Sequence, residues 1–136
     1  MLKLNAKPKR RWHVNNMASF SKNIAFSVLR EVARAKRLQQ QKQYEEAFIC
    51  LENAHVLGQS STRWHVYVHS LMLILGIQKH SVKEVFGQVL RIVGAASKTA
   101  VGLVPSGNTG GSNISPFKRL PIASHLARKI QRAQVR

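Results

Sequence analysis

Four side chains that can bind a metal ion lie close together in the segment ENAHVLGQSSTRWHVYVH, which runs from Glu52 to His69. Glu52 and His55 are three residues apart, and His65 and His69 are four residues apart, so each pair shares one face of a helix. A short connection makes two such helices antiparallel neighbours, and the four side chains then converge. Three imidazoles and a carboxylate suit Zn²⁺, Fe²⁺, Ni²⁺ or Cu²⁺. The spacing therefore predicts a site for one divalent transition metal, with Gln59 extending the first face.

The same segment also allows a purely structural interpretation. Trp64 and the aliphatic residues around His65 and His69 indicate a buried corner, in which each imidazole donates one N–H to a carbonyl or to Glu52. A di-iron centre is excluded, because it needs a second Glu-x-x-His pair and further glutamates, and the chain has only five acidic residues. A single metal ion and a hydrogen-bonded corner both stay open, and the apolar neighbours favour the corner.

A glycine-rich loop, GNTGG at residues 107–111, is the other segment with a distinctive composition. Its backbone N–H groups could hold an anion, but the loop lacks the GK[ST] ending of a P-loop and precedes no clear helix. Tight turns with positive φ explain the glycines more simply. We expect the loop to fold back across the histidines, with Asn108 or Thr109 contacting them.

The elements that must position these residues are helices. Apolar residues recur at helical spacing from Ser19 or Ser21 onward, then over residues 44–58, 63–76 and 81–96, with polar turns at 39–43, 60–63 and 79–81. Ser81 and Glu84 have the spacing of a capping box. In the fourth helix the apolar stripe, which continues to about Ala96, consists of Val82, Val85, Phe86, Val89, Ile92 and Val93.

This pattern predicts an all-α protein built from two antiparallel helical hairpins. Residues 45–54 align with residues 83–92 at an offset of 38, which resembles a tetratricopeptide-type pairing, although two pairs favour a compact four-helix unit. The predicted division is a flexible basic arm at 1–18, a helical domain at 19–98, a Gly/Pro-rich extended segment at 99–123, and a basic tail or short helix at 124–136.

The positive charge is concentrated at the two ends of the chain. The net charge is +17 overall, with +10 in residues 1–44, +1 in 45–117 and +6 in 118–136. Such basic ends are typical of proteins that bind nucleic acid or an acidic partner protein. The nucleic-acid candidates are Lys7, Lys9, Arg10, Arg11 and Trp12 in the arm, and Arg30, Arg34 and Arg37 on the first helix. A solvated surface is the simpler interpretation of the helical arginines.

The cysteine content and the most apolar run of the sequence indicate the cellular compartment of the protein. Cys50 is the single cysteine, so no intrachain disulfide forms, which fits a reducing compartment. The most apolar run, at residues 71–77, is far shorter than a membrane span. We therefore expect a soluble, cytoplasmic protein.

The motifs ENAHVLGQ, RWHVYVH, VPSGNTGG and ISPF together resemble a small bacterial family of unknown function. The resemblance covers about residues 25–126 and implies a bacterial, cytoplasmic, mostly helical protein. The basic ends lie outside it. The leading hypothesis is a helical binding or interaction module that holds one metal ion. The alternatives are a nucleic-acid-associated protein and a metal-dependent enzyme.

Overall fold

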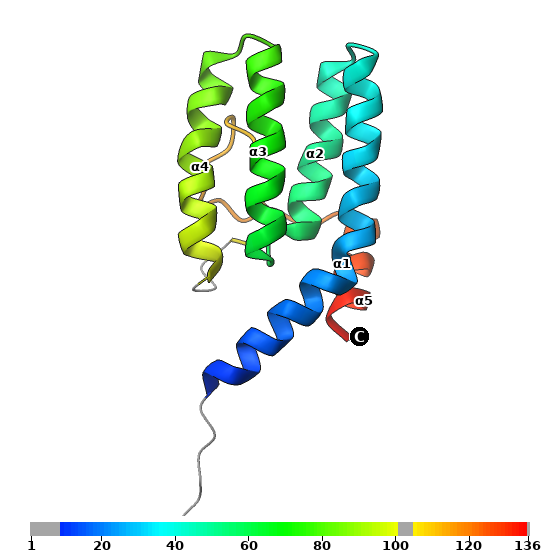
Figure 1. The fold of residues 1–136 in the computed structure, drawn as a ribbon, viewed down its shortest axis with the longest axis vertical. Coiled ribbons are helices and arrows are strands. Elements are labelled where there is room, and N and C mark those ends of the chain that lie inside the picture. The colour runs from blue at the N-terminus through cyan, green and yellow to red at the C-terminus, as the bar shows by residue number, and fades with distance from the viewer. Residues whose placement is uncertain (1–8, 101–104, 136) are drawn as a thin grey trace, which may run out of the picture.

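The computed structural model describes the backbone of residues 9–100 and 105–135, with side chains for residues 18–97 and 105–135. Within these residues the chain is all-helical and contains no strand, which confirms the predicted fold class (Figure 1). The helices are α1 (Lys9–Gln40), α2 (Tyr44–Gly58), α3 (Thr62–Gln78), α4 (Val82–Ala100) and α5 (Ser124–Val135).

The first four helices form the two predicted hairpins, because α1 packs against α2 and α3 packs against α4. Helix α2 joins the hairpins by packing against α3, and α1 also contacts α3 (Figure 1). The buried core lies between them and is aliphatic: Ile24, Val28, Val32, Leu57, Val68, Met72 and Leu75. The apolar stripes predicted for the first three helices therefore meet in one core.

The two hairpins turn in the same way. Lys42 (φ 60°) and His80 (φ 53°) adopt the left-handed conformation just after α1 and α3. The next residues, Gln43 and Ser81, each donate a backbone hydrogen bond of 2.9 Å to a carbonyl five residues back. This is the Schellman pattern of helix termination. The two motifs are 38 residues apart, which is the offset of the internal repeat in the sequence.

Helix α1 is longer than the apolar pattern suggests, because it begins at Lys9 and not near Ser19. Figure 1 shows its first part leaving the four-helix unit in a different direction, with α5 beside the bend. Helix α5 is fastened there by Asn23, whose amide donates to Ala133 O at 3.0 Å, and by Lys129, which lies 3.8 Å from the buried Glu31. The division into arm, domain and tail stays a prediction.

The apolar stripe of α4 is largely exposed. The side chains of Val82, Phe86, Val89 and Val93 are between 46% and 81% exposed. The face that packs against α3 carries the fully buried Gln88 and the buried Ala95. Helix α4 therefore turns a polar side chain inward, toward the histidines.

Residues 105–123 form no helix or strand and return from α4 toward α5, along the orange trace in Figure 1. Gly107 (φ 75°) and Gly110 (φ 85°) confirm the turns with positive φ that the glycines predicted. A methyl group on Gly107 would lie 1.9 Å from Leu120 O, so the two arms of this segment are in tight contact.

No helix in the described part of the chain has the length and apolar character required to cross a membrane.

Candidate metal centre

Three buried histidines meet where α2 and α3 pack together. His55 comes from the last turn of α2, and His65 and His69 share one face of α3. The turn at residues 59–61 is short, so the helices are antiparallel and all three rings point into the same space. Ring centroids are 4.6–4.9 Å apart, and one ligand nitrogen from each ring lies within 4.8 Å of the others.

The proton on His55 is placed by the glycine-rich loop. Nδ1 of His55 lies 2.8 Å from the backbone oxygen of Asn108. A carbonyl oxygen only accepts hydrogen bonds, so Nδ1 carries the proton and Nε2 keeps its lone pair. The orientation of the ring and the position of its proton are therefore set by a residue 53 positions away in sequence.

The proton on His69 is placed by Gln88 of α4. Nδ1 of His69 lies 2.6 Å from Oε1 of Gln88. The amide nitrogen of Gln88 donates to Glu84 at 2.6 Å and to Gly110 O at 2.9 Å, which leaves only its oxygen to face the ring. His69 therefore donates from Nδ1, and its Nε2 also keeps a lone pair.

These assignments leave two lone pairs facing one another. Nε2 of His55 and Nε2 of His69 are 3.1 Å apart, at hydrogen-bonding distance, but neither ring has a second proton to share. Two nitrogens bound to one tetrahedral Zn²⁺, with Zn–N bonds of about 2.0–2.1 Å, are separated by about 3.3 Å. The observed spacing matches the edge of such a coordination tetrahedron.

Burial keeps all three rings neutral. Desolvation, followed by the neighbouring histidines, lowers the pKa of His55 well below its ordinary 6.5. Desolvation likewise lowers the pKa of His65 to about 3 and that of His69 to about 4, although the hydrogen bond that His69 donates to Gln88 opposes the shift at His69. Neutral imidazole is the form that binds metals, and the hydrogen bonds made by Nδ1 leave Nε2 of His55 and of His69 with a lone pair.

The glycine-rich loop fits closely over His55. A methyl group on Gly110 would lie 2.9 Å from the imidazole, so only glycine allows this contact. Asn108 organises the loop: its amide donates to Ser115 O and Lys118 O at 2.9 and 2.8 Å, and its side-chain oxygen accepts from Gly110 N at 3.0 Å. The Asn108 carbonyl is thereby held in position for His55.

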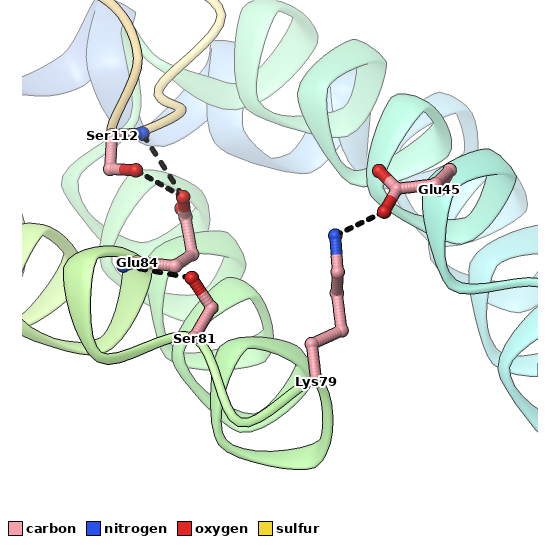
Figure 2. A network of polar contacts seen from close by, with 5 residues as sticks. All are labelled: Glu45, Lys79, Ser81, Glu84 and Ser112. Atoms are coloured by element: carbon pink, nitrogen blue, oxygen red, sulfur yellow. Dashed lines mark hydrogen bonds and ion pairs between the residues drawn. The ribbon is translucent and has the colours of Figure 1, made fainter.

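Glu84 ties the same loop to α4 (Figure 2). Its backbone N–H lies 3.4 Å from the Ser81 hydroxyl, which confirms that Ser81 caps the helix. The Glu84 carboxylate accepts from the backbone and hydroxyl of Ser112. It also accepts from the side-chain amide of Gln88. A second link, also in Figure 2, is the 2.5 Å ion pair between Lys79 and Glu45, which joins the α3–α4 turn to the start of α2.

A cavity of about 110 Å³ opens beside the three rings. Asn108 and Arg91 contribute its other polar groups, and the apolar remainder of its wall consists of Leu90, Gly94, Ala95, Pro105 and Pro116. Arg91 is held by a hydrogen bond from its guanidinium to Ile114 O. The histidines therefore face a space large enough for a few water molecules or a small ligand.

The sequence matches the family described as "Protein of unknown function (DUF3703)" over residues 22–130. The chain belongs to the DUF3703 family. The match includes the three histidines, Gln88, Arg91 and the loop over the site. No curated protein and no solved structure matches the chain.

Glu52, predicted as the fourth ligand, lies outside the histidine group of this DUF3703 protein. Its carboxylate is half-buried beside Gly111 and Thr109. Desolvation raises its pKa, and the neighbouring Thr109 hydroxyl opposes this shift. The structure thus brings together three of the four predicted ligands. A ligand role for Glu52 stays a prediction.

Two other residues singled out in the sequence lie at the ends of the α2–α3 turn. Gln59 is buried directly after α2, and its side-chain oxygen has no hydrogen-bond partner among the residues that the structure describes. Trp64 donates from its indole N–H to Ser21 O at 2.7 Å and stacks edge-on against Tyr67. Trp64 therefore anchors α3 to α1.

The sequence did not reveal Gln88 or Arg91. Gln88 is the one amide side chain in the α4 sequence and lies four residues after Glu84, with Val85 and Val89 on either side, which is a detectable signal. Arg91 has no comparable local signal, because its position beside the histidines depends on which face of α4 turns inward.

The basic candidates whose side chains the structure describes lie on α1, which supplies no histidine to the cluster. Arg30, Arg34 and Arg37 are exposed on α1, and Arg34 pairs with Glu31 at 3.1 Å. Lys7 lies outside the described residues, as do the side chains of Lys9, Arg10, Arg11 and Trp12. Their role in nucleic-acid binding stays a prediction.

Proposed function

We propose that this DUF3703 protein is a helical metal-binding module that holds one divalent transition metal ion through His55, His65 and His69. His55 and His69 bind through Nε2, because Asn108 and Gln88 occupy their Nδ1 protons. The metal is held between the two hairpins, since α2, α3, α4 and the glycine-rich loop all contribute to the site.

The observation that carries this proposal is the 3.1 Å contact between the two Nε2 atoms. In a purely hydrogen-bonded corner, one of these nitrogens would donate a proton to the other. Both protons are already committed elsewhere, and burial disfavours a third proton on the pair. A cation between the rings converts the repulsion of two lone pairs into coordination.

Zn²⁺ is the ion that we assign to the site. Three imidazoles satisfy its preference for nitrogen ligands and leave the fourth tetrahedral position directed to the cavity. Cu²⁺ is expected to bind the same nitrogens still more tightly when offered alone, following the general order of divalent affinities. A site with an open position is also what a metal-dependent enzyme requires, so that alternative stays open.

The proposal is tested by metal titration of protein purified without a histidine tag. The apo protein competes with a chromophoric chelator for Zn²⁺, and Co²⁺ loading reports the geometry through its visible absorption. We expect one ion per chain and the intense spectrum of tetrahedral Co²⁺. The variants His65→Ala and His69→Ala should each lose this binding.

The matched control is His125→Ala, which removes an exposed histidine on α5. This variant should bind Zn²⁺ like the wild-type chain. Absence of stoichiometric binding in the wild-type protein, or equal binding in His69→Ala and the wild type, would contradict the proposal. Circular dichroism of each variant shows whether the helices are intact.

A further inference from the structure

Arg91 places a positive charge beside the proposed metal site, and metal binding alone does not use this charge. The residue lies on α4, one helical turn after Gln88, and lines the same cavity as the three histidines. It is half-buried, and no carboxylate lies among the described residues that line this cavity. The role proposed here for Arg91 rests on the proposed metal site.

The charges around the cavity do not balance once a metal is bound. Three neutral imidazoles leave a divalent ion with its full charge of +2, and the guanidinium adds +1. The acid that influences Arg91 is Glu84, but its carboxylate is already occupied by Ser112 and Gln88. A partly enclosed positive site of this kind attracts a small anion.

The groups also define what kind of anion fits. The metal offers one open position to an oxygen, and a planar guanidinium pairs with two oxygens of a carboxylate or related oxyanion. The hydrogen bond to Ile114 O fixes one end of the guanidinium, and within the described part of the chain its other N–H groups remain available to a ligand. A cavity of about 110 Å³ accepts an anion of a few heavy atoms.

We propose that a small oxyanion, of the carboxylate or carbonate type, binds in the cavity with one oxygen on the metal and another on Arg91. Arg91 is then the residue that selects the ligand, while the histidines supply the metal. The protein would therefore recognise metal and oxyanion together, and each would strengthen the binding of the other.

The test uses the full chain loaded with Co²⁺ in a non-coordinating buffer. Acetate, bicarbonate and phosphate are titrated in turn, with chloride as the monatomic comparison, and the visible spectrum reports changes at the metal. We expect saturable changes with the planar oxyanions. In Arg91→Met the affinity for acetate should fall by about tenfold or more, because a charge-assisted pair is lost.

Arg37→Met, which removes an exposed arginine of α1, is the matched control and should behave like the wild type. If the wild type binds no Co²⁺, both proposals fail. If it binds Co²⁺ but acetate leaves the spectrum unchanged, or Arg91→Met binds acetate as tightly as the wild type, only the oxyanion proposal fails. Should Arg91→Met not take up Co²⁺, Arg91→Lys replaces it, and acetate affinity equal to that of the wild type would contradict the paired geometry.

Discussion

The chemistry of single residues in the site depends on which ring nitrogen carries the proton in His55 and in His69, whose Nε2 atoms face one another. His55 and His69 both carry their N–H on Nδ1, because Asn108 O and Gln88 Oε1 accept there. Hydrogen-bond partners behind a metal-binding histidine fix its tautomer and orient its ring. Removing such a partner frees the proton to move to Nε2, where it blocks the metal.

Gln88→Met tests this dependence. Methionine has a similar length but offers no comparable acceptor, so His69 loses its preference for the Nδ1 proton. We expect Zn²⁺ affinity to fall by about 10–100-fold while the helical content stays the same. Chelator competition measures the affinity. Gln131→Met, an exposed change on α5, is the control, and unchanged affinity in Gln88→Met would argue against tautomer control.

The three buried imidazoles also predict how stability depends on pH. Their pKa values in the folded apo protein lie below the ordinary 6.5, at about 3 for His65 and about 4 for His69. Between those values and 6.5 the unfolded chain binds more protons, so folding becomes less favourable as pH falls. We expect stability to be constant above about pH 7 and to fall below about pH 6.5, by up to roughly 1.4 kcal/mol per pH unit for each histidine.

Urea unfolding of the metal-free protein between pH 5 and 7.5 measures this effect. His125→Ala should show the same slope as the wild type, because the exposed ring is outside the cluster. A free energy of unfolding that does not change below pH 6.5 would show that the three rings are not held neutral.

At the scale of elements, the loop after α4 and helix α5 complete the molecule around the four-helix unit. The loop at residues 105–118 covers the histidine cluster, and α5 packs beside the bend of α1. Each depends on a small number of specific contacts, so single changes can test it.

Gly110→Ala tests the fit of the loop over His55. Alanine is strained at φ 85°, and its methyl group would lie 2.9 Å from the imidazole. We expect a loss of about 1–3 kcal/mol in the free energy of unfolding and weaker Zn²⁺ binding. Gly94→Ala is the control: nothing lies within 4 Å of its added methyl group, and alanine favours helix by about 1 kcal/mol. Equal stability of the two variants would contradict the proposed fit.

Glu31→Gln tests how α5 is held. Glu31 is buried on α1 and lies near Arg34 of the same helix and Lys129 of α5. Removing its charge leaves Lys129 without this partner, so we expect α5 to exchange its amide hydrogens faster and stability to fall by about 1–2 kcal/mol. Hydrogen exchange followed by mass spectrometry measures this. Glu46→Gln, exposed on α2, should leave α5 unchanged.

Charge divides the whole molecule into a nearly neutral centre and strongly basic ends. If the ends bind nucleic acid, binding should weaken steeply with salt, because each phosphate contact releases counterions. Replacing Lys7, Lys9, Arg10 and Arg11 by serine should reduce affinity for a fluorescent DNA duplex and flatten its salt dependence. His65→Ala should leave the affinity for the duplex and its salt dependence unchanged. Equal affinity of the serine variant and the wild type would remove the case for this segment.

The amino-acid sequence by itself determined the helices and most of their ends. Apolar residues at helical spacing, capping at Ser81 and polar turns act over a few residues, so they can be recognised locally. The spacing of His65 and His69 likewise placed them on one helical face. The resemblance to a small family of unknown function also agrees with the family match over residues 22–130.

Only the tertiary structure decided which face of α4 turns inward and how the site is completed. Val82, Phe86 and Val93 belong to the apolar stripe of α4 in the sequence, yet they are exposed and α4 buries Gln88 instead. The contacts that fix the protons on His55 and His69 join residues 53 and 19 positions apart. Such contacts depend on how the hairpins and the loop pack together, and no local pattern encodes that packing.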